Sequence, residues 1–397
     1  MRKINIYPIL SSLHDDEYIK KERETLLRNL KELTGYEFKI TSIDNLYDGD
    51  LGIILVESGG SENYFLEAYD KLKGPYVFLT FKHNNSLAAA MEILTFLGRE
   101  GKKGEILHGE TEVIAERIKD LITEQDNSVK LGVIGAQSDW LISCKVNKDT
   151  LKRNFGIELV DVSTDELISN YDSHKYDKCP EDLLKATFDR HELNKAYRIY
   201  LSIKDIVKKY NLKGFTIRCF DLLETIHSTA CLALAMFNDE GIIGTCEGDL
   251  PALISMYLVR KLLNKPSFQA NPSEIDTINR EMILAHCTLP LKMTNSYTFT
   301  THYESKIGVG IKGEMNLGKC FIFRISADLD KYVILNAEIV ENLSRCNLCR
   351  TQIRVKVKKG INYFLTNPLG NHHIIVYGDD YDKIINYLDS KNLKRIN

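Results

Sequence analysis

Carboxylate side chains follow two short apolar runs in the middle of the chain, each with the composition of a buried strand. Asp221 comes soon after the run Phe215 to Cys219. Glu247 and Asp249 follow the run Ile242 to Cys246. Ligands of parallel α/β sheets bind beyond the carboxyl ends of the strands, where these acids are expected to meet. Close carboxylates repel each other unless a cation or a proton separates them, and hard divalent cations prefer oxygen ligands, so the pattern indicates a metal site.

The same acids also have a purely structural interpretation. Aspartate is favoured at helix N-caps, so Asp221 or Asp249 could cap the helix that follows it, and Glu247 could simply face solvent. Two strand ends that both present carboxylates favour the functional interpretation.

Two adjacent histidines, His372 and His373, precede an apolar run near the C-terminus. In a strand their rings point to opposite faces, so at most one is expected to be a metal ligand. The other would pack, or would hydrogen-bond a substrate hydroxyl. Two weaker candidates are His286, at the end of another apolar run, and Arg350, whose guanidinium could bind a hydroxyl or an acidic substrate group.

These residues must be positioned by parallel strands and by the helices between them. Apolar runs such as Leu51 to Val56 and Tyr76 to Phe81 alternate with helical patterns, which is typical of βαβ units and a parallel sheet. A polar stretch near residue 127 precedes a second alternation of the same kind. We therefore expect two doubly wound α/β domains, at residues 1–127 and 128–284, with the acids in the second.

The texture of the sequence changes after about residue 285. Strand-like runs separated by turn residues replace the helical patterns as far as Tyr381, where a short helix to Leu388 is expected. This pattern is typical of an antiparallel sheet or barrel. Residues 285–397 are therefore predicted to form a C-terminal antiparallel β domain that carries His372.

Composition restricts the partners that the chain is expected to have. Its 397 residues carry a net charge of −3, which gives no strong field for nucleic acid or an anionic membrane. No apolar stretch reaches the roughly 18 residues of a membrane span, and the N-terminus does not read as a secretory signal. A cytoplasmic protein is expected. The nine cysteines are an odd number scattered through a long chain, so reduced thiols are expected rather than a disulfide framework. The C-x-x-C motif Cys346–Cys349 has no second pair with which to bind zinc.

Three segments together resemble the L-fucose isomerase-related branch of the L-fucose/L-arabinose isomerase superfamily. They are Asn238 to Asp249, Leu284 to Cys287 and Gly370 to Asp379. The resemblance extends over residues 215–380 and is specific in the Cys-Glu-Gly-Asp and Gly-Asn-His-His motifs. It implies two α/β domains, a C-terminal β domain, and a metal-dependent interconversion of an aldose and a ketose with Mn²⁺ or a similar ion.

The resemblance also implies that two acids of the middle domain and a histidine near the C-terminus hold the ion. Asp249 matches the second acid best, with Glu247 close by. His372 matches the histidine best, with His373 as the alternative. Asp221 is the choice for the first acid and a metal ligand.

Glu224 has a spacing to Asp249 that also suits the first acid, so it remains an alternative to Asp221.

Isomerisation takes a proton from one carbon beside a carbonyl and returns it to the other carbon, a transfer that carboxylates can carry out. Asp221 and Glu247 are assigned to this proton transfer, and the metal would stabilise the enediolate. The residues expected to bind substrate are His286, Arg350, Asn371 and His373.

The implied partner is a small-molecule sugar. The resemblance further implies a homo-oligomer in which a neighbour's N-terminal domain completes each site, and the loop Ser11 to Asp16 is the candidate contributor. Two other functions fit the same residues. One is different enediolate chemistry on a carbohydrate, such as aldol-type cleavage, and the other is non-catalytic sugar binding on the same scaffold.

Overall fold

The computed structural model describes residues 2–13, 16–72, 74, 76–126, 129–184 and 187–396. Contacts divide the chain into two compact units, Met1–Ser128 with Arg153–Gly156, and Val129–Lys152 with Ile157–Asn397. None of the described helices has the length and apolar character needed to cross a membrane.

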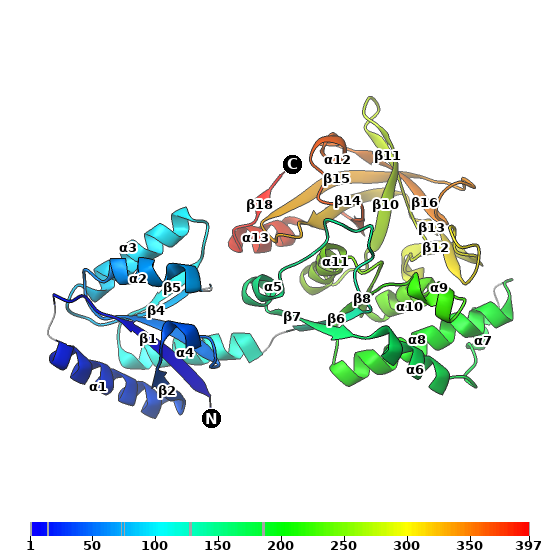
Figure 1. Cartoon of the computed structure of the whole chain (residues 1–397). Helices are drawn as coiled ribbons and strands as arrows, with labels where there is room; N and C mark the ends of the chain where they lie inside the picture. The colour runs from blue at the N-terminus through cyan, green and yellow to red at the C-terminus, as the bar shows by residue number, and fades with distance from the viewer. Residues whose placement is uncertain are drawn as a thin grey trace. The chain divides into compact units, whose positions relative to one another are not determined.

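The first unit is a five-stranded parallel sheet in the order β2-β1-β3-β4-β5 (Figure 1). Its elements are β1 (Lys3–Ile9), α1 (Asp16–Thr34), β2 (Glu37–Ile40), η1 (Ile43–Asn45), β3 (Leu51–Val56), α2 (Glu62–Ala68), η2 (Tyr69–Lys71), β4 (Tyr76–Thr80), α3 (Ser86–Arg99), β5 (Gly104–Leu107) and α4 (Thr111–Asp126).

Helices cover both faces of this sheet. On β3, Ile53 and Leu55 pack in the same cluster as residues of α1 and α4, whereas Ile54 and Val56 pack with α2 and α3. A strand that is apolar at every position reflects this burial on both sides. The loop Ser11 to Asp16, expected to reach a neighbouring subunit, includes His14 and Asp15, which lie outside the described residues.

The second unit begins with a four-stranded parallel sheet in the order β7-β6-β8-β9. Its elements are β6 (Val129–Ile134), the first part of α5 (Lys148–Phe155), β7 (Ile157–Val162), α6 (Thr164–Ser173), α7 (Glu181–Leu184), α8 (Arg190–Tyr210), β8 (Gly214–Ile217), α9 (Asp221–Thr225), α10 (Cys231–Glu240), β9 (Ile243–Cys246) and α11 (Leu250–Leu263).

An antiparallel sheet of seven strands follows, in the order β14-β17-β10-β11-β16-β15-β18, in which only β18 runs parallel to its neighbour. A further pairing of β14 with β15 closes six of these strands into a barrel. The remaining elements are β10 (Phe268–Asp276), β11 (Glu281–His286), η3 (Leu291–Met293), the hairpin β12 (Thr294–Thr300) and β13 (Gly310–Met315), β14 (Gly318–Ile325), β15 (Lys331–Asn342), β16 (Thr351–Val357), α12 (Tyr363–Thr366), β17 (His373–Tyr377), α13 (Asp382–Ser390) and β18 (Lys394–Arg395).

The predicted combination of parallel sheets with helices and a later antiparallel sheet is confirmed. The antiparallel sheet starts at Phe268, before the change of texture seen at residue 285. The second half of β10 gave little strand signal, because its sequence is polar and a register shift falls between Pro272 and Glu274.

Helix α11 connects the two sheets of the second unit. It packs against β8 and β9 of the parallel sheet and against β14 and β17 of the barrel. Asp249, at the N-terminus of α11, therefore contacts Arg324 of β14 and His372, which precedes β17, although these residues are far apart in the sequence.

Candidate functional site

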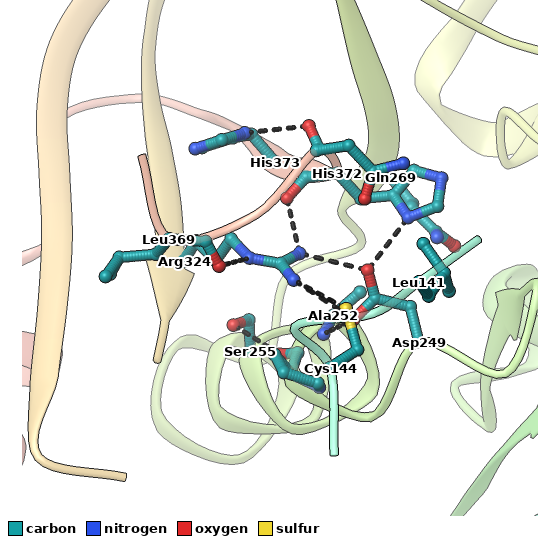
Figure 2. Close-up of polar contacts among 12 residues, drawn as sticks. Leu141, Cys144, Asp249, Ala252, Ser255, Gln269, Arg324, Leu369, His372 and His373 are labelled. Atoms are coloured by element: carbon teal, nitrogen blue, oxygen red, sulfur yellow. Dashed lines mark hydrogen bonds and ion pairs between the residues drawn. The ribbon is translucent and has the colours of Figure 1, made fainter. Parts of the chain in front are cut away.

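Asp249 is the N-cap of α11, and its carboxylate is fully buried. The Ala252 backbone N–H donates to Oδ1 at 2.9 Å, which satisfies one of the free amides of the first helical turn. Oδ2 lies 2.8 Å from Nδ1 of His372 (Figure 2). Asp249 therefore has both of the roles considered for it, a helix cap and a partner of the C-terminal histidine.

Arg324 from β14 neutralises this buried carboxylate. Its guanidinium is fully buried and donates to both oxygens of Asp249, at 3.1 and 3.3 Å (Figure 2). It also donates to the backbone carbonyls of Leu369 and His372. A β-carbon on Gly370 would lie 2.5 Å from the guanidinium, so the glycine before the two histidines leaves room for Arg324.

His372 is fully buried between two carboxylates. Its Nε2 lies 3.7 Å from Oε1 of Glu247 and has no hydrogen-bond partner among the described residues. Burial opposes protonation, but the hydrogen bonds and charges of Asp249 and Glu247 outweigh it and raise the pKa of His372 to about 9. Without a bound metal ion, the imidazolium of His372 is the positive charge that lies between the two acids, in addition to the Arg324 guanidinium on Asp249.

Glu247 is the acid of this group that reaches solvent, with 14% of its side chain exposed. Its other oxygen, Oε2, accepts a hydrogen bond of 2.7 Å from the indole N–H of Trp140. Burial alone would raise its pKa, but His372 outweighs burial and lowers the pKa of Glu247 to about 2. The carboxylate is therefore ionised and available to a substrate.

The backbone that carries Glu247 has an unusual conformation. Glu247 has φ 67° and Gly248 has φ 74°, both in the left-handed region. A β-carbon on Gly248 would lie only 2.5 Å from the Ala136 carbonyl oxygen, so this position requires glycine. A left-handed non-glycine residue costs roughly 1–3 kcal/mol and is common at functional sites, where the fold holds it in place.

His286, at the end of β11, lies close to both Glu247 and His372. Its ring centroid is 5.5 Å from that of His372, and its Nδ1 is 3.0 Å from the Thr288 hydroxyl. Burial lowers the pKa of His286 to about 3, so its imidazole is neutral. Donor atoms of His286, Glu247 and Cys246 all lie within 4.8 Å of one another, close enough to hold one ion.

Asp221 does not join this group. It begins α9, where Oδ1 accepts a hydrogen bond of 3.0 Å from Arg218, and within the described part of the chain it forms no hydrogen bond or ion pair with Asp249 or His372. The reason is that β8 ends at Ile217, so the chain has already turned away from the strand end. The alternative first acid, Glu224, lies exposed on the same short helix.

The two adjacent histidines have different surroundings. His373 is buried with its Nε2 3.0 Å from the Tyr363 hydroxyl, and its ring packs on Phe364. Its Nδ1 lies 3.1 Å from the Asn371 carbonyl oxygen (Figure 2). Burial lowers the pKa of His373 to about 3. Asn371 is exposed and reaches Asn271 at 3.3 Å. These contacts make His373 a packing residue.

Arg350 is half-buried and donates to the carbonyl and hydroxyl oxygens of Thr301 at 2.7 and 3.1 Å. Its charge contributes to lowering the pKa of the neighbouring His302, an effect due first to burial. Arg350 therefore brings a positive charge close to His302.

Sequence reasoning missed Arg324 and Trp140. Arg324 had a detectable signal, because it stands within the strand-like run Cys320 to Ile325, and an arginine in a buried strand needs an anionic partner. Trp140 had no detectable signal in the sequence, because it is far from Glu247 along the chain and reaches it only in the folded protein.

The charge on His372 predicts how stability depends on pH in the cation-free protein. Its pKa is raised from 6.5 to about 9, so its contribution to the free energy of unfolding is complete below pH 6.5 and is lost as pH rises through 9. The difference in this free energy between the wild type and His372→Gln, measured with EDTA present, should shrink over that range. His191→Gln, at an exposed position of α8, is the control. A difference that stays constant from pH 6.5 to 9 would show that His372 is not charged.

No protein-family model matches the chain. The chain is similar to several curated proteins. The chain is 23% identical over 282 residues to a sulfoquinovose isomerase from Priestia aryabhattai, a match that covers 65% of this chain and 62% of the relative. It is 23% identical over 289 residues to a sulfoquinovose isomerase from a Clostridium species, covering 68% and 64%, respectively. This chain therefore spans less than two thirds of the length of each relative and is similar, over about two thirds of its own length, to enzymes named sulfoquinovose isomerase.

Proposed function

We propose that the chain is an aldose–ketose isomerase that uses a divalent cation and acts on a sugar bearing an anionic group. The observation that carries the proposal concerns Nε2 of His372, which is buried, has no hydrogen-bond partner in the part of the chain that the structure describes, and lies 3.7 Å from an ionised Glu247. The similarity to sulfoquinovose isomerases supports both the reaction class and the anionic, sulfonated substrate.

The donor set fits a divalent cation. Glu247 and His286, whose donor atoms lie within 4.8 Å of each other, are proposed to hold it together with His372, whose Nε2 lies 3.7 Å from Oε1 of Glu247. Mn²⁺ is the expected ion. Contact with Cys219 and burial raise the pKa of Cys246 well above its ordinary value, so its neutral thiol is a poor ligand. When bound, such a cation supplies a Lewis acid for carbonyl and hydroxyl oxygens.

Asp249 has a different role in this proposal from the one expected from the sequence. Its oxygens are occupied by Arg324, by Nδ1 of His372 and by the N-terminus of α11. A carboxylate that binds one nitrogen of a histidine fixes the ring and directs the other nitrogen to the cation. Asp249 is therefore proposed to orient His372 instead of binding the ion itself.

Glu247 is proposed to move the proton. It is ionised, it reaches solvent, and Trp140 holds one of its oxygens in place. It would take a proton from the carbon beside the sugar carbonyl and return it to the neighbouring carbon, with an enediolate between the two steps. Arg350 is the proposed partner of the anionic group, because a guanidinium can bind two oxygens of such a group at once.

Metal analysis together with a substrate screen tests this proposal. We expect protein purified without chelator to contain one divalent ion per chain and to interconvert sulfoquinovose with its ketose. EDTA should remove both the ion and the activity, and Mn²⁺ should restore activity. Unsulfonated hexoses and pentoses in the same screen test the requirement for the anion.

The screen also separates the proposal from the two other functions. Cleavage would give two- or three-carbon products, which an isomerase cannot make. A binding protein would still retain sugar in EDTA and would show no exchange in any condition. Either result would replace the isomerase proposal.

A further inference from the structure

The thiols of Cys219 and Cys246 lie in contact, and Cys246 directly precedes Glu247 in the chain. Cys246 is the last residue of β9, and Cys219 lies two residues past Ile217, the residue that pairs with Cys246 in the parallel sheet. Their Sγ atoms are 2.9 Å apart and buried. Neighbouring parallel strands thus bring together two cysteines that are distant in the sequence, and neither has a role in the proposed reaction.

The local structure holds the two sulfurs in contact. Cys246 N–H donates to the Gln269 side-chain oxygen at 2.9 Å, and the Gln269 amide donates back to the Cys246 carbonyl oxygen at 3.4 Å. The Cys219 N–H donates to the Ile217 carbonyl oxygen at 3.0 Å. A disulfide requires sulfurs about 2.05 Å apart, so the movement needed is below about 1 Å.

A small cavity borders one of these sulfurs. Its lining consists of Cys219, Phe220, Leu223, Thr229, Cys231 and His302. Phe220, Leu223 and His302 are partly exposed, so the cavity can be reached from solvent. Cys219 lines the cavity and Cys246 does not, which makes Cys219 the sulfur that a small molecule would meet first.

We infer that Cys219 and Cys246 form a modification site that hydrogen peroxide closes to a disulfide, and that closure displaces Glu247. Peroxide transfers one oxygen to the Cys219 sulfur, which becomes a sulfenic acid as one water leaves. The Cys246 sulfur then attacks the Cys219 sulfur, the S–O bond breaks, and the hydroxyl leaves as a second water with the thiol proton. The two cysteines together lose two electrons, which peroxide accepts.

The expected displacement of Glu247 follows from its covalent connection to Cys246. Glu247 is bonded to Cys246 and has a left-handed backbone that tolerates little rearrangement. Its Oε2 accepts the hydrogen bond from Trp140, and Trp140 is the single tryptophan of the protein. Tryptophan fluorescence therefore reports on Glu247 without any measurement of turnover, so this inference can fail independently of the proposed function.

The experiment uses the full chain, treated with hydrogen peroxide, quenched with catalase and alkylated. Trypsin leaves Cys219, Cys231 and Cys246 in one fragment, because no lysine or arginine lies between Cys219 and Cys246. Adding Glu-C, which cleaves after Glu224, Glu240 and Glu247, separates the three cysteines. We expect peptide 219–224 to be linked to peptide 241–247, the tryptophan emission to change, and dithiothreitol to reverse both.

Two variants control the assignment. Cys231→Ser, at a thiol that lines the same cavity, should keep the link. Cys246→Ser should lose it and leave a sulfenic acid on Cys219 that dimedone traps. A Cys219–Cys231 link, or oxidation of Cys219 to sulfinic acid without any link, would overturn the pairing. A Cys219–Cys246 link with unchanged tryptophan emission would overturn the displacement of Glu247.

Discussion

Glu247→Gln is expected to reduce aldose–ketose exchange by about 10²–10⁴-fold, the usual contribution of a positioned general base. Glutamine keeps the size of the side chain and can still accept the hydrogen bond from Trp140, but it cannot take a proton. The measurement is kcat with saturating Mn²⁺ and sulfoquinovose, followed by exchange of the substrate C2 hydrogen with solvent deuterium. Both rates should fall together.

Glu224→Gln is the matched control for this prediction. Glu224 was the alternative first acid, but it lies exposed on α9. Its replacement is expected to leave kcat within about twofold of the wild type, as is usual for surface substitutions away from a site. Equal losses in the two variants, or full turnover by Glu247→Gln, would remove Glu247 from the mechanism.

Arg324→Met is expected to lower the free energy of unfolding by about 3–5 kcal/mol, the cost of leaving a buried charge without its partner. Asp249 and Arg324 are both fully buried, and the guanidinium also satisfies the carbonyls of Leu369 and His372. Methionine fills a similar length but donates no hydrogen bond. Urea unfolding followed by circular dichroism measures the change.

Arg354→Met provides the comparison on a partly exposed ion pair. Arg354 on β16 donates a hydrogen bond of 2.8 Å to Glu341 on β15, and both side chains reach solvent. Such pairs contribute about 0–1 kcal/mol, so this variant should unfold close to the wild type. Similar losses for the two arginines would mean that burial of the Asp249–Arg324 pair does not govern its contribution.

Much of the architecture could be predicted because each helix or strand depends mainly on residues that are close together in the sequence. Runs such as Leu51 to Val56 are apolar at every position, which only a strand buried on both faces requires. The later strands were detectable from turn residues and apolar runs. The start of the barrel was not, because most of β10 is polar and its register shift disrupts the alternation.

The candidate site was predictable only in part. Asp249 and His372 were both chosen from the sequence, and Oδ2 of Asp249 lies 2.8 Å from Nδ1 of His372. Asp221 was placed by assuming that an acid after a strand stays at the strand end, but β8 ends four residues earlier and Arg218 pairs with the acid on α9. The metal, the substrate and the homo-oligomer remain predictions.

The sequence by itself determined the kinds of strand and helix, the acids that follow β9 and the histidine pair at the start of β17, since each depends on residues that are close in the chain. Only the tertiary structure decided which side chains share a site. Arg324, Trp140 and His286 meet Asp249, Glu247 and His372 across separations of about 40 to more than 100 residues. Contacts over such separations leave no periodicity or motif, because they are set by how α11 packs against both sheets.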